Sequence, residues 1–456
     1  MAHLMHRSGS ILYQNKARTV TLIDIPLSIS LSQGTPDHPS TDLLYSASPL
    51  EKPHPSLEPR SIKAKQRVQE RLSDPTLTLP SFPSDWLSQG LAEIRAERPQ
   101  AFCLERRIDR LLPTRHKEDQ VQKGRLHLFE ENMRESKIKI PERCTSAWRE
   151  PQGPLILSSS ASIGEYGILQ ASQLMNKVIR NISARPVLVR VGHSDRNYSI
   201  PPFSVFMLSN IGHREASHFS KMATKLLPEP SLSAAPGQFD FILLDPPWEN
   251  RSVRRSKTYA SGRKADDDPM QVLGGMLGKH MAPGALVACW ITNKASVRDA
   301  ALQAFERWGL ELVEEWAWLK ITVHGEPVCD LDGSMRRPYE TVLVGKLVDE
   351  TLGRFNDSIS AEASTRRLIV AVPDLHSRKP CLKEIIEPMM RDKSGYRALE
   401  IFARNLTAGW WSWGNEVLRY NWKGHWTEGY IQDDTNCKAK SREGVMAGEE
   451  TVDGAQ

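Results

Sequence analysis

The sequence predicts an α/β protein built around a mostly parallel sheet. From about residue 153 onward, short apolar runs alternate with longer amphipathic stretches, and several of the runs are apolar on both faces. Strands of that kind are typical of sheets that helices cover on both sides, and such sheets are mostly parallel. The chain has 456 residues, of which 39% are hydrophobic, so it is long enough for two or three domains and a substantial core.

The first part of the chain predicts little regular structure. Residues 9–30 contain two runs of apolar and β-branched residues around Asn15-Lys16, which predicts a strand hairpin. From Leu31 to Pro83, serine and proline dominate. This composition buries too little apolar surface to offset the entropy of ordering, so we expect mostly a mobile linker, with a short helix near Lys63 to Leu72.

Residues 84–150 carry helical patterns, of which 84–97 is the clearest because its apolar residues recur at near-helical spacing. We therefore expect a partly disordered and partly helical N-terminal region before the α/β domain. The predicted domains are an N-terminal segment with a Ser/Pro-rich linker (1–83), an accessory helical region (84–150), the α/β domain (151–425) and a polar C-terminal tail (426–456).

Eight segments of the α/β domain are predicted strands, and helix candidates lie between them. One helix is expected to begin at Asp268-Pro269, with Asp as N-cap and Pro in the first turn. Another is expected to begin at a capping box formed by Ser296 and Asp299 and to end before Gly309. The predicted strands are 186–191, 203–208, 239–245, 285–292, 312–320, 340–346, 367–372 and 398–403.

Composition excludes several classes of protein. The six cysteines, at 103, 144, 289, 329, 381 and 437, form no C-x-x-C pair, which argues against a zinc site or a disulfide framework, so we expect reduced thiols and no metal. The N-terminus lacks a signal-peptide core, and the apolar run 285–291 is too short to span a bilayer, which predicts a soluble intracellular protein. A net charge of +5 is mild, so any claim of nucleic-acid binding must depend on local patches.

The predicted strand 239–245 ends in Asp245-Pro246-Pro247-Trp248, a combination of residues that is suited to a specific reaction. Ligands bind beyond the carboxyl ends of parallel strands, and Asp245 lies at such an end. The prolines force the chain out of the sheet and leave the carbonyl of Pro246 available, while Trp248 offers a flat ring. Asp245 and this carbonyl could each accept an N–H of a purine amine, with the base stacked against Pro247 and Trp248. The alternative is an ordinary turn after a strand.

A basic run follows the motif directly. It contains Arg251, Arg254, Arg255, Lys257, Arg263 and Lys264, together with Tyr259. Because the run leaves from the predicted purine pocket, we expect Arg251, Arg254, Arg255, Lys257 and Tyr259 to contact the phosphates or bases of a polynucleotide. The alternative is a solvated loop. A target base must be single-stranded, terminal or flipped to reach such a pocket.

These residues resemble a known family. "DPPW" after an apolar strand is similar to the MT-A70 (MT-A-seventy) family of adenine-N6 methyltransferases, and "DPPWENRSVRRSKTYA", with "LEIFARNL" and "WWSWGNEV" downstream, resembles its methyltransferase-like protein four branch. The resemblance covers roughly residues 150–420. It implies a Rossmann-like domain with a strand order permuted relative to most class I methyltransferases, S-adenosyl-L-methionine as cofactor, and methylation of adenine N6 in nucleic acid.

The resemblance also implies roles for individual residues. Asn210 and Ile211, in "FMLSNI", correspond to the recognition site for the cofactor's adenine, although the family often has Asp at the position of Asn210. Lys379, in "HSRKP", corresponds to the partner of the methionine carboxylate. Glu400, Arg404, Asn415 and Glu416, in "LEIFAR" and "WGNEV", are implied near the ribose, with Asp245 also at the cofactor.

The substrate remains open at this level. The resemblance favours RNA over DNA, including small nuclear RNA with a 2′-O-methylated adenosine. The expected location is the nucleus, with the cytoplasm as an additional location. DNA adenine methylation and a non-catalytic nucleic-acid-binding partner are the alternatives, although non-catalytic members lose the Asp-Pro-Pro-Trp residues that this chain keeps. A small-molecule or protein amine methyltransferase is disfavoured by the basic run. We expect activity without an obligate partner subunit.

Overall fold

The computed structural model describes most of the α/β region and parts of the N-terminal half. The described residues are 9–55, 61–63, 66, 82–98, 101–108, 153–158, 167–169, 171–191, 196–231, 234–248, 269–333, 336–348, 365–375, 377–393 and 395–428. No helix among them is long and apolar enough to cross a membrane.

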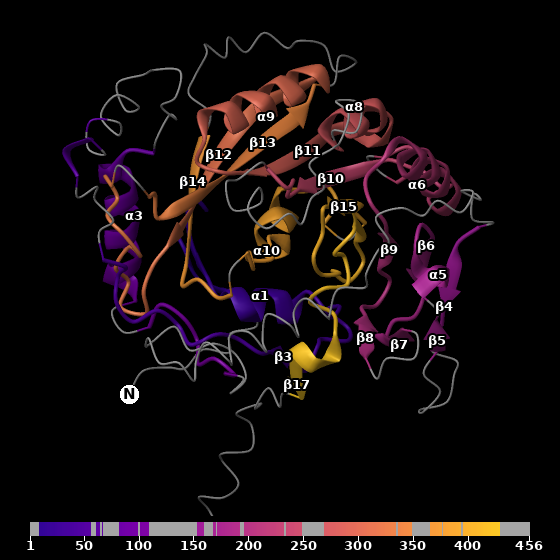
Figure 1. Ribbon diagram of the computed structural model, residues 1–456, viewed down its shortest axis with the longest axis horizontal. Coiled ribbons are helices and arrows are strands. Elements are labelled where there is room, and N and C mark those ends of the chain that lie inside the picture. Colours follow the sequence, from indigo (N-terminus) through magenta and orange to yellow (C-terminus); the bar gives the residue numbers. More distant parts are fainter. Residues whose placement is uncertain are drawn as a thin grey trace, which may run out of the picture.

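A single large sheet organises the described part of the chain (Figure 1). Its 12 strands are ordered β1 (Ile11–Gln14), β2 (Val20–Ile23), β14 (Thr365–Ala371), β12 (Leu310–Lys320), β13 (Tyr339–Leu347), β11 (Met281–Ile291), β10 (Phe239–Leu244), β15 (Ala398–Ile401), β16 (Trp411–Gly414), β9 (Val205–Leu208), β6 (Val178–Asn181) and β4 (Leu155–Leu157). The strands form an arch in Figure 1.

Most neighbouring strands are parallel, which confirms the predicted fold class. β10 pairs in parallel with β11 and β15, β15 with β16, and β16 with β9. β13 is antiparallel to both β11 and β12, so those two run in the same direction, and β14 is parallel to β12. The late strands β15 and β16 insert between β10 and the early strand β9, as expected for a permuted Rossmann-like order. Eight strands, among them β2, which is parallel to β14, therefore direct their carboxyl ends to one edge of the sheet.

Helices cover both faces of the arch. α6 (His213–Leu226), α8 (Pro269–His280) and α9 (Ala295–Arg307) bury apolar side chains against the convex face, where β10 contributes Ile242 and Leu244. α1 (Ile25–Leu31) and α10 (Lys383–Ile386), which continues into η3 (Glu387–Met389), lie inside the arch against Phe241 and Leu243 of β10 (Figure 1). Because helices cover both faces, β10 is buried throughout its length.

The predicted helix boundaries are close to the observed ones. α8 begins at Pro269, and the turn after α9 passes through Gly309 at φ +71°, a conformation that favours glycine. The predicted capping box at Ser296 is wrong: α9 begins at Ala295, its N-cap is Lys294, and no side chain caps it. α3 (Ser84–Glu97) confirms the helix predicted at 84–97 and packs Leu87 and Leu91 against the β14 end of the sheet.

One predicted strand lies outside the main sheet. β7 (Val187–Val191) forms a three-stranded sheet with β5 (Gly167–Leu169) and β8 (Asn197–Ile200). Few residues separate β7 from β8, and so short a connection pairs two strands as an antiparallel hairpin. α5 (Ala171–Leu174) precedes β6 on the same side of the molecule.

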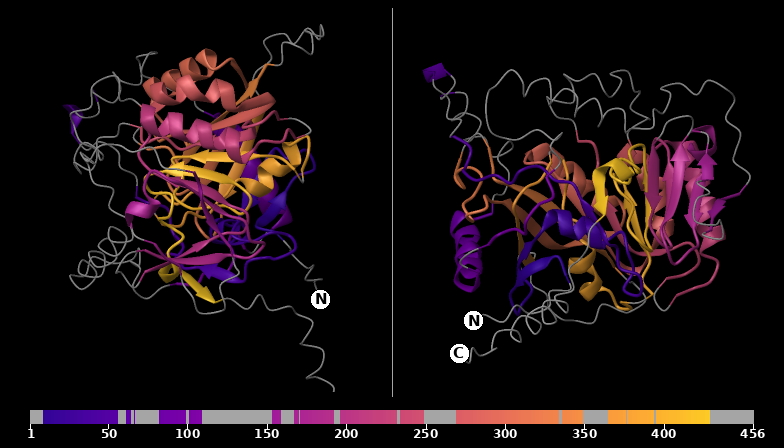
Figure 2. Two further views of the ribbon diagram at one scale, coloured as in Figure 1. Left: turned by 90° about the vertical axis from the view of Figure 1, so that its right-hand side faces the viewer. Right: turned by 90° about the horizontal axis from the view of Figure 1, so that it is seen from below.

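The N-terminal hairpin is confirmed, but its place was not predicted. β1 and β2 pair antiparallel, and β2 then extends the main sheet by pairing in parallel with β14. Seen from below, the indigo chain that follows this hairpin, through α1, crosses the open side of the arch beside the yellow C-terminal elements (Figure 2, right). The N-terminal hairpin is therefore part of the same sheet as the α/β domain.

The predicted mobile linker is wrong for residues 32–55. β3 (Asp42–Leu44) pairs with β17 (Trp426–Glu428), which follows η4 (Lys423–His425), and Leu44, Ala47 and Leu50 are buried. These few apolar side chains suffice because the backbone around them finds hydrogen-bond partners in distant segments, for example Ala408 N–H to Ser32 O at 2.8 Å. Most of the short helix expected near Lys63 to Leu72 lies outside the described residues. The division into four domains stays a prediction.

Candidate active site

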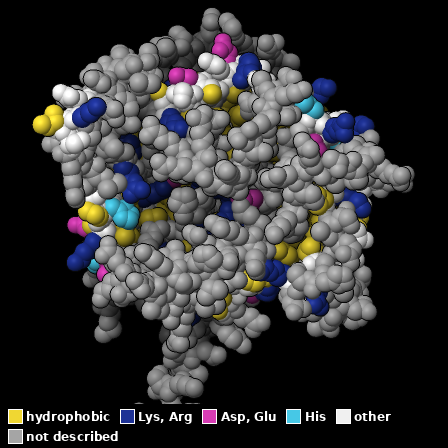
Figure 3. Space-filling model, in the orientation of Figure 1, with side chains coloured by type: hydrophobic (Ala, Val, Ile, Leu, Met, Phe, Trp, Pro, Cys, Tyr) yellow, Lys and Arg dark blue, Asp and Glu magenta, His cyan; other side chains and the backbone are white. Residues whose placement is uncertain are grey.

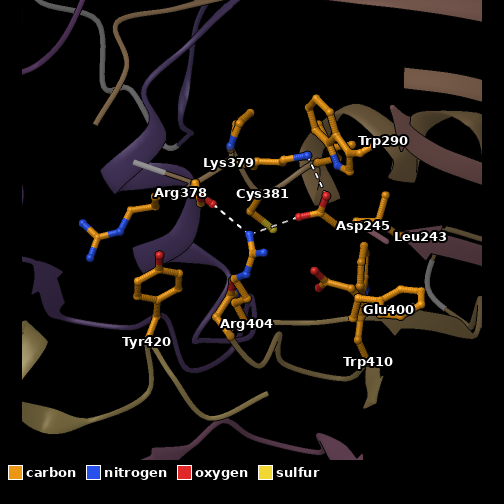
Figure 4. Close-up of a pocket in the computed structure, with 15 residues that line it drawn as sticks. Leu243, Asp245, Trp290, Arg378, Lys379, Cys381, Glu400, Arg404, Trp410 and Tyr420 are labelled. Carbon is orange, nitrogen blue, oxygen red and sulfur yellow. Dashed lines mark hydrogen bonds and ion pairs between the residues drawn. The ribbon is translucent and has the colours of Figure 1, made fainter. Parts of the chain in front are cut away.

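The candidate site lies where four neighbouring parallel strands end. Asp245 follows β10, Arg404 follows β15, Asn415 and Glu416 follow β16, and Asn210 follows β9. Because these strands are parallel and adjacent, the residues that leave them share one edge of the sheet. A pocket at this edge is lined by Asp245, Lys379, Glu400 and Arg404 (Figure 4), and charged side chains of both signs are visible near the middle of the same face (Figure 3).

Asp245 is held between two cations. Lys379 Nζ lies 2.7 Å from Asp245 Oδ1, and Arg404 Nη1 lies 3.3 Å from Oδ2. The backbone N–H of Asp245 donates to Ile401 O at 3.3 Å, which extends the β10–β15 ladder by one residue and fixes the carboxylate at the end of the strand. The side chain is 18% exposed, so it faces the pocket. Asp245, Lys379 and Arg404, which the sequence placed in one site, are thus brought into contact.

Lys379 has two further neighbours that sequence analysis did not assign to the site. Its Nζ lies 3.5 Å from Glu340 Oε2 and 4.2 Å from the centroid of the Trp290 ring, a cation–π arrangement. Glu340 also accepts from Lys320 Nζ at 2.5 Å. Burial opposes ionisation of Glu340, but the positive charges of Lys379 and Lys320 outweigh it and lower the pKa of this carboxyl to about 2.

Glu340 was missed because the argument from strand ends considered only carboxyl ends. β13 is antiparallel to its neighbours, so its first residues, Tyr339 and Glu340, lie at the edge where β11 and β12 end. An acidic residue at the start of an apolar strand was the available signal. The orientation of the strand was not readable from the sequence.

On the other side of Asp245, the charges continue in alternation. Arg404 Nε lies 3.3 Å from Glu416 Oε2, and Arg419 Nη1 lies 3.0 Å from the same oxygen. Together these contacts form a chain of ion pairs across the strand ends. We call this series the ion-pair chain: Lys320, Glu340, Lys379, Asp245, Arg404, Glu416 and Arg419.

Glu400 lies in the same pocket but in a different electrostatic state. Burial raises the pKa of Glu400 to about 8, and the neighbouring Asp245 carboxylate adds to the shift, against the opposing charges of Arg404 and Lys379. Burial likewise raises the pKa of the Cys381 thiol to about 11, so this cysteine is uncharged at neutral pH. Glu400 can therefore donate as well as accept a hydrogen bond near pH 7.

Two predictions about the Asp-Pro-Pro-Trp motif need correction. The Pro246 carbonyl is not unengaged, because it accepts from the Trp248 backbone N–H at 2.8 Å in a tight turn. A carbonyl oxygen has a second lone pair and can still accept from a ligand. Trp248 is not a free platform either: its Nε1 donates to Trp290 O at 2.7 Å, and its ring packs against the core beneath α8 and α9. Pro247 is half-buried beside it.

The far end of the site carries uncharged amides. Asn415 Nδ2 donates to Asn210 Oδ1 at 3.4 Å, which brings together two residues from different predicted elements. Ile211 packs against the core on the convex face. Trp413 Nε1 donates to Ser209 Oγ at 2.8 Å and thereby ties the end of β9 to β16. The substrate residues predicted in the basic run, Arg251, Arg254, Arg255, Lys257 and Tyr259, lie outside the described residues.

Comparison with known protein families matches residues 239–416 to MT-A70. The MT-A70 domain contains Asp245, Lys379, Glu400 and Arg404, whereas Asn210 precedes it. The suspected family is thus confirmed for this part of the chain.

Three curated relatives illustrate the similarity. The chain is 44% identical over 194 residues to the "N6-methyladenosine RNA methyltransferase MTA1" of Cryphonectria parasitica, which is 42% of this chain and 55% of that protein. It is 34% identical over 260 residues to the human "N(6)-adenine-specific methyltransferase METTL4" (56% and 50%). It is 29% identical over 250 residues to the "DNA N6-methyl methyltransferase" of Caenorhabditis elegans (54% and 60%). The chain thus spans about half the length of the curated relatives it matches.

The residues present fit S-adenosyl-L-methionine, the cofactor that the MT-A70 family implies. The molecule combines a zwitterionic amino acid, a sulfonium cation, a ribose and an adenine. The charged end of the pocket offers cations from Lys379 and Arg404 and a carboxylate from Asp245. The amide end, at Asn210 and Asn415, offers neutral hydrogen-bonding groups. Among the described residues, no three His, Cys, Asp or Glu side chains gather in a way that could hold a metal.

Proposed function

We propose that this chain transfers a methyl group from S-adenosyl-L-methionine to the exocyclic N6 amine of adenine in a nucleic acid. The observation that carries the proposal is Asp245, placed at a parallel strand end within a matched MT-A70 domain and paired with both Lys379 and Arg404. The names of the relatives support the reaction type. The chain spans about half the length of those proteins, so we propose, and do not transfer from them, its activity and its substrate.

The role of Asp245 follows from the chemistry of the amine. The lone pair of an adenine amine is delocalised into the ring, so the nitrogen is a poor nucleophile. When Asp245 accepts one N–H and the second lone pair of the Pro246 carbonyl accepts the other, the nitrogen is held in one orientation. Orientation and electrostatic stabilisation supply rate without a covalent step. The bound cofactor supplies the methyl group on a positively charged sulfur.

The remaining residues bind and orient. Lys379 is suited to the cofactor's carboxylate, and Glu400 and Glu416 are suited to the ribose hydroxyls. Asn210 Oδ1 is suited to the cofactor's adenine amine, since an amide oxygen can accept more than one hydrogen bond. Trp248, anchored through its indole N–H, is suited to present one edge of its ring beside Pro247 as a rigid wall for the target base.

RNA is the favoured substrate. The relative with the highest of the three identities quoted is named as an RNA methyltransferase, and another is named as a DNA methyltransferase. We therefore propose RNA first, with a 2′-O-methylated adenosine of small nuclear RNA as one candidate, and DNA as the alternative. We also propose that the protein is located in the nucleus and that it is active without an obligate partner subunit. A non-catalytic binding role is less consistent with an ion-paired Asp245 at the strand end.

The test uses the full chain with a tritiated cofactor and adenine-containing RNA and DNA oligonucleotides. Wild type is expected to label N6, and Asp245→Asn to lose at least about a hundredfold in kcat, the loss expected when a charge-stabilising group is removed. Binding of S-adenosylhomocysteine by Asp245→Asn should persist and shows that the variant is folded. Equal turnover by Asp245→Asn would contradict the proposed role, and methylation of DNA alone would overturn the preference for RNA.

A further inference from the structure

The segment that follows β14 carries Lys379, and residues far outside the MT-A70 domain hold it in place. Ser377, two residues before Lys379, has φ +67°, a left-handed conformation that is costly for a residue with a Cβ. Such a conformation persists only where surrounding contacts determine it. Those contacts come from residues 28, 45, 47 and 106, all in the N-terminal part of the chain.

Arg106 binds the start of this segment. Its Nη2 donates to Val372 O at 2.8 Å and its Nη1 to Pro373 O at 3.0 Å. Nη1 also donates to Ala47 O at 3.3 Å, and the same nitrogen lies 3.8 Å from Asp374 Oδ1. The Arg106 side chain is only 2% exposed, so these bonds form in a buried environment where their geometry is strongly determined.

Asp374 and Arg378 bind the end of the segment. Arg378 Nη1 lies 2.6 Å from Asp374 Oδ2 and donates to Tyr45 O at 2.8 Å, while Ala47 N–H donates to Asp374 Oδ1 at 2.9 Å. The Arg378 and Asp374 side chains are 1% and 0% exposed. We call Arg106, Asp374 and Arg378 the clasp. It joins the N-terminal segment to the residue that directly precedes Lys379.

A second bond holds the segment on the other side of Lys379. Ser28 Oγ, in α1, accepts from the Cys381 backbone N–H at 3.0 Å. Ser377 O also accepts from Arg404 Nη1 at 3.3 Å, so the other cation beside Asp245 contacts the same segment. Both cations of the pocket therefore depend on the path of this segment (Figure 4).

A buried cluster of two guanidinium groups and one carboxylate is a poor choice for stability alone. Two positive charges share one negative charge at almost no exposure, and well-packed apolar residues often replace buried ion pairs without loss of stability. What the charged groups provide is direction, because Arg106 donates to two carbonyls at the start of the segment, Val372 O and Pro373 O, and Arg378 at its end donates to Tyr45 O. This geometry suits a device that fixes the position of Lys379.

We propose that Arg106 is a positioning residue for cofactor binding: with Asp374 and Arg378 it sets the position of Lys379 relative to Asp245. The inference rests on the proposed function. It assigns to residues 28–47 and 106, which precede the matched MT-A70 domain, a part in the geometry of the active site. A fragment limited to the domain would have Lys379 but not the contacts that place it.

The experiment uses the full chain and three variants. Arg106→Met removes the donors and keeps the aliphatic stem, Arg106→Lys keeps one charged donor, and Ser28→Ala removes only the bond to Cys381. The matched control is Arg98→Met, because Arg98 also donates to a backbone carbonyl of the N-terminal region, Leu12 O at 2.8 Å, which lies on β1 and not on the Lys379 segment. Titration calorimetry with S-adenosylhomocysteine measures binding, and thermal unfolding confirms that each variant is folded at the temperature used.

Arg106→Met is expected to weaken S-adenosylhomocysteine binding about tenfold and to raise KM for the cofactor similarly, with kcat within about threefold of wild type. Arg106→Lys should recover part of the affinity, Ser28→Ala should lose about threefold, and Arg98→Met should bind like wild type. A purely structural role would lower the unfolding temperature without changing the affinity of the folded protein. Folded Arg106→Met that binds like wild type overturns the proposal; if this variant does not fold, full wild-type affinity in Arg106→Lys, which cannot make the guanidinium contacts, overturns it.

Failure of this inference and failure of the proposed function give different results. Wild type that binds S-adenosylhomocysteine but methylates no adenine overturns the proposed function, while the affinities of the variants still decide the role of Arg106. Wild type that methylates adenine, with unchanged affinity in Arg106→Met, overturns only the positioning role. Wild type that binds no S-adenosylhomocysteine overturns both.

Discussion

The two ends of the site differ in the way they are built. At one end, Asp245 is the middle member of an ion-pair chain that extends from Lys320 to Arg419. At the other end, Asn210 and Asn415 meet through one amide hydrogen bond of 3.4 Å, next to the apolar side chain of Ile211. Both ends lie at the same edge of the sheet, because they follow adjacent parallel strands.

The difference indicates how each end can recognise its ligand. Ion pairs in a partly enclosed pocket respond to pH and to salt, and they suit the charged amino-acid part of the proposed cofactor and the reacting amine. Amides and apolar side chains respond to shape and hydrogen-bonding pattern, and they suit a neutral heterocycle. Three substitutions test this comparison.

Glu400→Gln is expected to have the largest effect. The pKa of Glu400 is raised from 4.5 to about 8, so the folded protein holds a proton that the unfolded chain releases. Wild-type stability should therefore fall as pH rises from 4.5 to 8 and level off above that, by up to a few kcal/mol. Glutamine cannot ionise and should remove this slope. Chemical denaturation of both proteins across that pH range measures the difference between their free energies of unfolding.

A matched control for this measurement is Glu311→Gln, because Glu311 is exposed on β12. It should shift stability by less than about 0.5 kcal/mol at every pH. If wild type and Glu400→Gln show parallel stability profiles between pH 4.5 and 8, the charged end does not hold a protonated carboxyl.

Glu340→Gln should give a smaller effect of opposite pH dependence. The pKa of Glu340 is lowered from 4.5 to about 2, so the carboxylate stabilises the fold above pH 4.5, and this contribution is lost as pH falls from 4.5 to 2. Because the side chain is 30% exposed, solvent screening limits the contribution to about 1–3 kcal/mol. The stability of Glu340→Gln should thus lie below wild type at pH 7 and approach it near pH 2. If the difference in stability between Glu340→Gln and wild type stayed constant from pH 7 to pH 2, the result would be inconsistent with the pairing of Glu340 to Lys379 and Lys320.

The sequence predicted the residues of the charged end better than it predicted the contacts that these residues make. Asp245 was predictable because a mostly apolar strand followed by two prolines marks both a strand end and an exit from the sheet. The strand, the helices at 269 and 295, and the parallel character followed from periodicity and composition. Lys379, Glu400 and Arg404 came from resemblance to the family, because single charged residues near strand ends have no pattern of their own.

The sequence did not reveal contacts that depend on topology. Glu340 lies at the site only because β13 runs antiparallel, and the Pro246 carbonyl is engaged because the turn directs the Trp248 N–H back to it. The N-terminal hairpin joins the sheet through pairing of Leu22 with Val370, about 350 positions apart in the chain. The Ser/Pro-rich composition likewise gave no indication of Ala47, whose backbone N–H donates to Asp374 and in this way helps to place Lys379. Composition reports averages, whereas a few well-placed hydrogen bonds decide whether such a segment is ordered.

At the amide end, Asn210→Ala is expected to give the smallest effect and the clearest contrast. The substitution removes one neutral hydrogen-bond acceptor, so S-adenosylhomocysteine should bind about three- to fivefold more weakly, corresponding to roughly 0.5–1 kcal/mol. Asn210→Asp keeps an acceptor oxygen and should bind within about twofold of wild type. Titrations at low and high salt should show that the loss in Asn210→Ala is independent of salt, because no charge is removed. Lys379→Met is the comparison from the charged end, and its loss should shrink as salt rises, since screening weakens the pairing of Lys379 with an anion. If the Asn210→Ala loss also shrinks with salt, both ends bind through charge and the contrast between them fails.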